Sequence, residues 1–171
     1  GVQTCALPIC YNGDMCYTFA VGDIAPETMQ LLRVTKQSLY KGIAAAKLGN
    51  RIGDVSSAVQ TYCERHGYSI VREMCGHGIG REMHEDPEVP NYGRKGTGAI
   101  IRNGMCFCIE PMVNLGKRNI MIGRDGWTCT TRDRLPSAHY EHTIAVVDGQ
   151  TKVLTTFDYI EQELGDRSIQ N

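Results

Sequence analysis

Two segments in the first third of the chain carry apolar residues at the three- and four-residue spacing of amphipathic helices. The first spans residues 26–47, and its apolar stripe is interrupted only at Lys36. Pro26 suits the first turn of this helix, and Gly49 ends it. The second segment spans residues 53–66. The pattern therefore predicts two consecutive helices of several turns each.

The rest of the chain consists of short apolar, β-branched runs separated by turn residues. The predicted strands cover residues 68–74, 105–114, 119–123, 127–131, 138–147 and 151–156. A glycine-rich turn with His77 follows the first strand, and a loop then runs to Gly104. Polar turns at 124–126 and 148–149 predict two hairpins. With a short helix at 158–164, these elements predict an α+β domain in which two helices pack on a curved antiparallel sheet.

Composition narrows the class of protein. The chain has 171 residues with 42% hydrophobic content, enough for one domain with a real core. The formal charge is −1 without runs of like charge, and this favours neither nucleic acid nor a membrane surface as a partner. Eight cysteines occur without a C-x-x-C pair, so we expect buried, reduced thiols in a cytoplasmic protein.

Four separated positions carry candidate metal ligands. His77 lies among glycines, Glu110 interrupts an apolar run, Glu141 precedes an apolar strand, and Asp14 stands near the start. A carboxylate in an apolar run is costly to bury unless it is paired, hydrogen-bonded or metal-bound. The alternatives are an edge-strand Glu110 facing water, a surface carboxylate at Asp14 and a structural histidine. Oxygen and imidazole ligands favour Mn²⁺, Fe²⁺, Co²⁺ or Zn²⁺.

Longer motifs surround these positions. They read YNGDMCYTFAVG, GHGIGREMHEDPEVPNYG, IEPMVNLG and DGWTCTTRDRLPSAHYEHTIAV. Together they resemble the type I methionine aminopeptidases, a branch of the pita-bread metalloenzymes, from residue 11 to about residue 163. The DGWT and EHT motifs are typical of this type I branch. The resemblance implies a pita-bread fold, incomplete at its N-terminus, with a curved antiparallel sheet and helices on its outer side.

The resemblance also implies a centre of two divalent metal ions, such as Co, Mn, Fe or Zn. Asp14, His77, Glu110 and Glu141 match four of the five ligand positions of the family. Glu141 would bridge the two cations, and the water between them would be the nucleophile. Glu110 would also carry the proton from this water to the departing amine.

The same resemblance implies the substrate contacts. His84 matches the histidine that contacts the substrate amide and steadies the tetrahedral intermediate. Met83 and Trp127 match residues that line the pocket for the methionine side chain. The implied substrate is the N-terminal methionine of nascent polypeptides in the cytoplasm. We expect a monomer that associates with ribosomes and binds neither specific nucleic acid nor membrane.

The chain departs from the family pattern near its start. The family carries another metal-binding aspartate eleven residues before Asp14, where this chain has Gln3. We therefore expect residues 1–10 to be an unrelated or artefactual leader, 11–164 the C-terminal portion of the catalytic domain, and 165–171 a tail. Two alternatives remain. A non-catalytic pita-bread binding protein would have lost its ligands, and a proline-directed pita-bread peptidase would lack the signature around Trp127.

Overall fold

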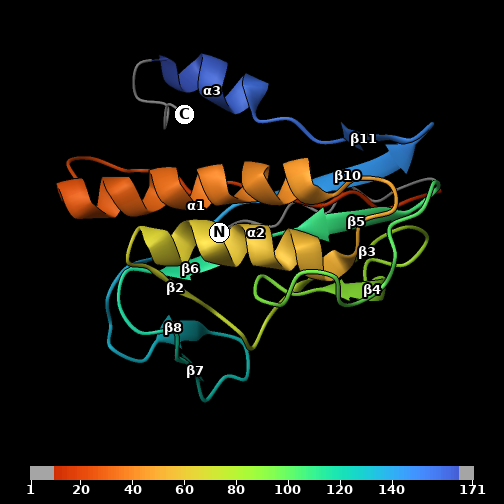
Figure 1. The fold of residues 1–171 in the computed structure, drawn as a ribbon. Helices are drawn as coiled ribbons and strands as arrows, with labels where there is room; N and C mark the ends of the chain where they lie inside the picture. Colours follow the sequence, from red (N-terminus) through yellow and green to blue (C-terminus); the bar gives the residue numbers. More distant parts are fainter. Residues whose placement is uncertain (1–9, 166–171) are drawn as a thin grey trace.

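The computed structural model describes residues 10–165, in which two long helices lie side by side over one face of an antiparallel sheet (Figure 1). The six-stranded sheet has the order β1-β10-β5-β3-β4, and β11 also pairs with β10. Its strands are β1 (Met15–Cys16), β3 (Gly76–Gly78), β4 (Glu85–Val89), β5 (Cys106–Ile109), β10 (Glu141–Val147) and β11 (Gln150–Val153). This arrangement confirms the predicted α+β class.

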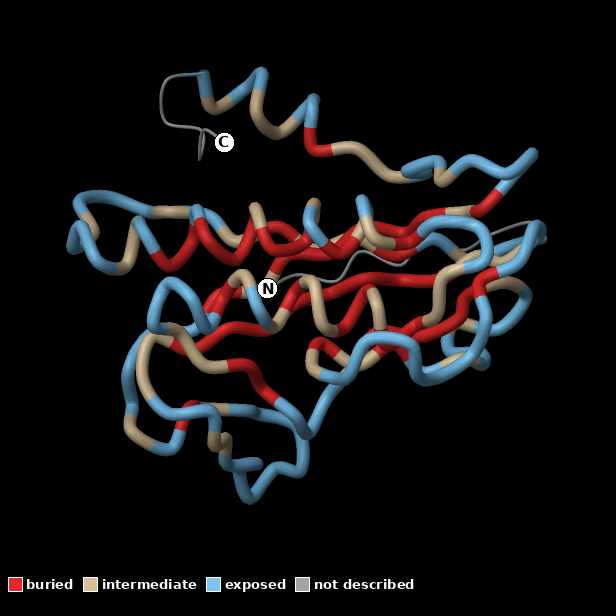
Figure 2. The backbone as a smooth tube through the Cα atoms, in the orientation of Figure 1, coloured by how far each residue is buried: buried red, intermediate tan, exposed pale blue. Residues whose placement is uncertain are grey.

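The two predicted long helices are confirmed as α1 (Pro26–Ala45) and α2 (Ile52–Arg65). Their buried sides face each other and the sheet (Figure 2). Gly42 makes this close packing possible, since a Cβ there would lie 2.8 Å from Val59 Cγ2 and 3.2 Å from Ile109 Cγ2. The Asp54 carboxylate caps the start of α2 by accepting a hydrogen bond from the Arg51 N–H at 2.8 Å.

Two predicted strands are each divided in two. The run 105–114 forms β5 and then β6 (Met112–Asn114), which belong to different sheets. The break falls at Glu110-Pro111, where a proline cannot donate a ladder hydrogen bond. The run 138–147 forms β9 (Ser137–His139) and β10, separated by Tyr140. At both breaks the chain passes between the six-stranded sheet and a three-stranded sheet. The three-stranded sheet has the order β2-β6-β9, with β2 at Ser69–Ile70.

The glycine-rich segment around His77 is a strand, not the predicted turn. It forms β3, paired with β4 on one side and β5 on the other. A Cβ on Gly76 would lie 2.3 Å from the Cys108 carbonyl oxygen, and one on Gly78 would lie 2.1 Å from the Asp86 carbonyl oxygen. Because glycine has no side chain, the backbones of the neighbouring strands can approach closely at these two positions. Strand β4 lies in the predicted loop, and the predicted strand 68–74 contracts to β2 (Ser69–Ile70).

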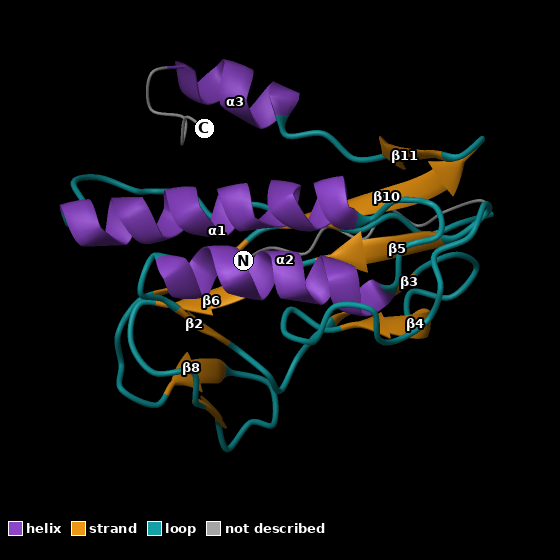
Figure 3. Ribbon diagram, in the orientation of Figure 1, coloured by secondary structure: helices purple, strands orange, loops and turns teal. Residues whose placement is uncertain are grey.

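The predicted terminal helix and both hairpins are confirmed (Figure 3). Strands β7 (Ile120–Ile122) and β8 (Cys129–Thr131) form a separate two-stranded hairpin. Helix α3 (Asp158–Leu164) lies beside α1. Its Glu161 Oε1 forms an ion pair with Lys36 Nζ of α1 at 2.6 Å. Lys36 is only 1% exposed, so this interruption of the apolar stripe lies inside the protein.

The cysteine prediction holds in part. The seven cysteines within the described range are free thiols, but only Cys63 and Cys108 among them are buried. Cys10 and Cys129 are exposed. Within residues 10–165 there is also no helix with the length and apolar character needed to cross a membrane. Gln3, the rest of the predicted leader up to residue 9 and tail residues 166–171 lie outside the described range.

Candidate metal centre

Alternation along β5 and β10 separates an apolar face of the sheet from a polar one. Ile109 faces α1, as its contact with Gly42 shows. His142 faces the same helix, with its Nε2 at 3.5 Å from the Tyr40 hydroxyl. Because neighbouring side chains on a strand point to opposite faces, Cys108 and Glu141 lie on the face away from the helices. The candidate ligands gather on this second face.

His77 presents one ring nitrogen to two carboxylates. Its Nδ1–H donates to the Gly78 carbonyl oxygen at 2.9 Å, so Nε2 is the ring nitrogen that faces the cluster. That Nε2 lies 3.6 Å from Glu110 Oε1 and 3.9 Å from Asp14 Oδ2. A nitrogen lone pair and two carboxylate oxygens repel one another unless a cation or a proton lies between them.

Asp14 is held at the edge of the sheet by Thr143 of β10. The Asp14 N–H donates to Thr143 Oγ1 at 3.0 Å, and the same hydroxyl donates to the Asp14 carbonyl oxygen at 2.7 Å. Asp14 is 7% exposed, so the predicted alternative of a surface carboxylate is wrong. Cys108 Sγ lies 3.4 Å from the same Oγ1, and its thiol also forms a hydrogen bond with the Glu141 carboxylate.

Glu110 lies at the break between β5 and β6, where its backbone is fixed by Asn91. The Asn91 side-chain amide donates to the Glu110 carbonyl oxygen at 3.0 Å. Glu110 is 9% exposed, so the edge-strand alternative facing water is also wrong. Its Oε2 lies 3.3 Å from His139 Nε2, a partner that the sequence analysis did not single out.

His139 and Glu141 both have strongly shifted pKa values. Burial lowers the pKa of His139, but the Cys16 thiol and the Glu110 carboxylate outweigh it and raise this pKa to about 10. Burial, together with the charges of Glu110 and Asp14, raises the pKa of Glu141 to about 8. The raised pKa of Glu141 shows that several buried carboxyl groups share one small region, and the raised pKa of His139 shows that a positive charge is favoured beside them.

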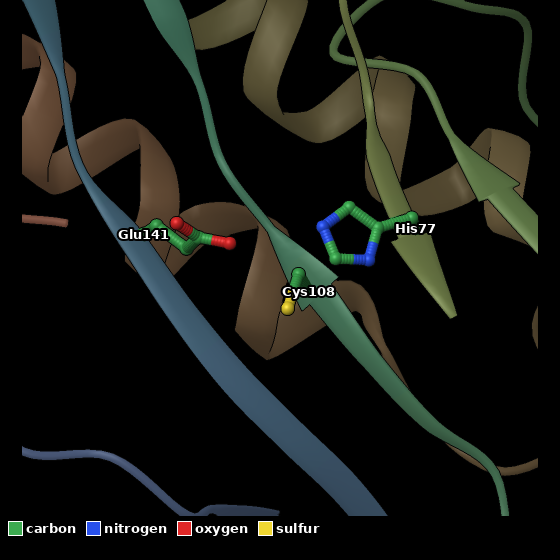
Figure 4. Close-up of side chains that lie close together, drawn as sticks. All are labelled: His77, Cys108 and Glu141. Carbon is green, nitrogen blue, oxygen red and sulfur yellow. The ribbon is translucent and has the colours of Figure 1, made fainter. Parts of the chain in front are cut away.

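The strongest sign that this cluster is built for a cation is the Glu141 carboxylate. The residue is 1% exposed, and within the described part of the chain neither carboxylate oxygen has an N–H or O–H donor, the weak S–H donor of Cys108 being its neighbour. Burying such a group without compensation is costly. Figure 4 shows Glu141, Cys108 and His77 projecting from three neighbouring strands, β10, β5 and β3, into one small region.

Glu141 belongs to two overlapping sets of ligand atoms. His77, Cys108 and Glu141 offer atoms that all lie within 4.8 Å of one another, and so do Glu110, His139 and Glu141. The donor chemistry, mainly carboxylate and imidazole with one thiol, fits a borderline divalent cation. Neither Cys108 nor His139 was identified from the sequence. The signal for His139 was its place in SAHYEHT, two residues before Glu141.

The predicted substrate residues divide into two groups. The His84 ring lies beside the metal cluster, with its centroid 4.3 Å from that of His77. Trp127 is 83% exposed and lines a cavity of about 760 Å³. Glu110 and His139 also line this cavity, so the cavity lies directly beside the metal cluster. Met83 is half-buried and is not among the residues that line the cavity.

A curved antiparallel sheet with two helices on one face and buried carboxylates and imidazoles on the other is the architecture of a pita-bread metallopeptidase. The chain belongs to metallopeptidase family M24, whose model matches residues 4–148. It is 48% identical over 145 residues to a methionine aminopeptidase of Clostridium acetobutylicum, covering 85% of this chain and 58% of that protein. Methionine aminopeptidase 1 of Bacillus subtilis is 46% identical, with the same coverage of both chains.

Solved structures agree with the fold. The crystal structure of methionine aminopeptidase from Rickettsia prowazekii matches with a TM-score of 0.84 at 43% identity, covering 85% of this chain and 59% of that one. A prolidase from Pyrococcus furiosus matches with a TM-score of 0.71 at 22% identity, covering 90% of this chain and 40% of that one, and supports the fold alone. The comparisons confirm the predicted family and pita-bread fold and favour methionine aminopeptidase over the proline-directed alternative.

The chain spans about three fifths of the length of the curated relatives that it matches. The matched portion nevertheless contains every candidate ligand described above, since Asp14 through Glu141 fall within residues 4–148.

Proposed function

We propose that the protein is a metal-dependent aminopeptidase that removes N-terminal methionine from polypeptides. The observation that carries the proposal is the buried Glu141 carboxylate, which has no N–H or O–H donor in the described residues and is shared by two sets of ligand atoms. The names of the most similar relatives support methionine as the residue removed. The substrate would then be met in the cytoplasm, where nascent chains leave the ribosome.

Two divalent cations are the proposed cofactor, with Asp14, His77, Glu110 and Glu141 as ligands and Glu141 between the two positions. His139 joins this set, because its ligand atom lies with those of Glu110 and Glu141. Bound cations would supply a Lewis acid for the peptide carbonyl and acidify the attacking water. The Co, Mn, Fe and Zn ions all suit this donor set.

The protein side chains have separate tasks in this proposal. Glu110 lines both the cluster and the adjoining cavity, so it can take the proton of the attacking water and pass it to the departing amine. His84, with its ring against that of His77, can donate a hydrogen bond to the substrate amide as negative charge develops there. Both groups act at the junction of cluster and cavity.

The cavity beside Glu110 suits a methionine side chain. Its apolar and sulfur-bearing lining includes Met112, Ile120 and Trp127. Such flexible and polarizable walls favour a thioether. Trp127 extends from the turn of the β7–β8 hairpin, and we propose that it closes over the bound side chain. Met83 keeps its proposed role only if binding of the peptide brings it toward this cavity.

The test is the release of methionine from a peptide with alanine in second position, measured with added Mn²⁺ or Co²⁺. We expect Glu110→Ala and His77→Ala each to lower turnover by on the order of 10²-fold or more, as loss of a proton-transfer group or a ligand does. His66→Ala is the matched control, since His66 is exposed at the end of α2. A Glu110→Ala variant with near-wild-type turnover would exclude Glu110 from the reaction.

A further inference from the structure

We propose that Cys108 adds a sulfur ligand to one end of the cluster, so that His77, Cys108 and Glu141 bind a thiophilic divalent cation such as Cd²⁺ or Zn²⁺. The inference deepens the metal centre proposed above and does not depend on the peptidase reaction. It starts from position: Cys108 lies on the central strand β5, between β3 with His77 and β10 with Glu141 (Figure 4).

The ligand atoms of these three residues lie within 4.8 Å of one another. Tetrahedral zinc with a Zn–S bond of about 2.3 Å and a Zn–N bond of about 2.0 Å separates sulfur from nitrogen by roughly 3.6 Å. The atoms therefore need to approach by about 1.5 Å at most, the largest change being between nitrogen and oxygen. All three residues are buried, so a cation held there would be largely screened from water.

The hydrogen bonds of these groups leave room for a cation. The Cys108 thiol lies between Thr143 Oγ1, a hydroxyl already engaged twice by the Asp14 backbone, and the Glu141 carboxylate, with which it forms a hydrogen bond. The His77 Nδ1–H is used by the Gly78 carbonyl oxygen, which directs Nε2 into the cluster. The Glu141 carboxylate, 1% exposed, has no N–H or O–H donor in the described residues, and the weak S–H donor of Cys108 lies against it.

The sulfur atom of Cys108 sets the metal preference of this site. Carboxylate and imidazole serve Mn²⁺ well, whereas a thiolate adds preference for softer cations. On binding, the Cys108 S–H bond breaks, a sulfur–metal bond forms and the proton is released to solvent. No electron is transferred. Cys108 would then make the centre bind Cd²⁺ or Zn²⁺ more tightly than the same site with oxygen and nitrogen ligands alone.

The experiment titrates the metal-free protein with Cd²⁺ and, separately, with Mn²⁺. For the wild type we expect a sulfur-to-cadmium charge-transfer band in the ultraviolet that saturates at one equivalent. In Cys108→Ser that band is lost and Cd²⁺ affinity falls by at least about tenfold, the smallest loss seen for groups that support a metal site. Mn²⁺ affinity stays near that of the wild type, because its hard ligands remain.

Cys106→Ser is the matched control, since Cys106 lies on the same strand but outside both sets of ligand atoms, and it should keep the band. Circular dichroism and Mn²⁺ binding check that each variant is folded, and Cys108→Ala serves if the serine variant is not. The proposal is overturned if the wild type shows no band at one equivalent or if Cys108→Ser keeps it. Failure of the wild type to bind Mn²⁺ would instead reject the proposed metal centre itself.

Discussion

The two faces of the central sheet use the same strands for opposite purposes. His139 and His142 lie three residues apart, yet their surroundings have little in common. His142 faces the helices, where its ring stacks on Phe157 at a centroid distance of 3.8 Å and burial lowers its pKa to about 4. His139 faces the carboxylates, and Cys16 and Glu110 raise its pKa to about 10 against the opposing effect of burial.

The same division is found within single strands of the central sheet, because β5 and β10 each carry residues of the core and residues of the site. Facing the helices, Phe107, Ile109 and Ile144 are fully buried in the hydrophobic core. Facing away, Cys108 and Glu141 are equally buried, but among charged groups that oppose one another. One face stabilises the fold by excluding water, whereas the other costs stability until a cation compensates its charge. Substitutions at neighbouring residues can separate the stabilisation by the apolar face from the cost of the buried charges on the polar face.

The largest effect should come from two adjacent residues of β10 that lie on opposite faces. We expect Glu141→Gln to lower methionine release by at least about a hundredfold, since it removes a ligand shared by both sets of atoms. His142→Phe should keep most of the activity, because it contacts α1 and Phe157 instead of the cluster. Turnover of a methionyl peptide measures both, and equal losses in the two variants would contradict the division into faces.

The next effect concerns the helix-facing side. Ile144 is fully buried, and Ile144→Ala should lower the free energy of unfolding by about 2–5 kcal/mol through lost burial and a cavity. Its Mn²⁺ affinity should remain close to that of the wild type at a temperature where the variant is folded. Urea unfolding and Mn²⁺ titration provide the two measurements. A large loss of Mn²⁺ affinity in the folded variant would show that the faces are energetically coupled.

On the polar face, we expect a substitution that removes charge to be stabilising. In the presence of a chelator, Glu141→Gln should raise the free energy of unfolding by about 1–3 kcal/mol, because an uncompensated buried carboxylate is removed. Mn²⁺ at a hundred times its dissociation constant should stabilise the wild type by about 2.7 kcal/mol. The variant should gain much less. Thermal unfolding with and without Mn²⁺ checks both statements, and destabilisation of the metal-free variant would refute them.

The smallest effect is expected at Asp54, which lies far from the cluster at the start of α2. Its carboxylate accepts hydrogen bonds from the Arg51 and Gly96 N–H groups, and these lower its pKa. The lowered pKa means that the stabilisation is present above the unfolded value of about 4 and is lost as the pH falls below it. Asp54→Ala should cost about 1 kcal/mol at pH 7 and less at pH 3 in urea unfolding. A pH-independent cost would contradict this origin.

The sequence by itself determined the helices, the hairpins and most of the candidate ligands. Helix periodicity and turn residues act over a few positions, so α1, α2 and the β7–β8 hairpin could be predicted from local pattern. Glu110 and His77 were recognisable because polar residues in apolar or glycine-rich runs are unusual. The resemblance to a known family then assigned them one shared site.

Only the tertiary structure decided which side chains meet and which strands divide. Glycines at 76 and 78 indicate a turn in isolation, but in the folded sheet they admit the backbone of two neighbouring strands. Lys36 interrupts an apolar stripe in the sequence, and yet it is buried because α3 returns to pair with it. Cys108 and His139 join the cluster through strand pairing between residues far apart in the chain. Local sequence cannot specify such contacts, because their free energy arises only when distant strands are brought into register.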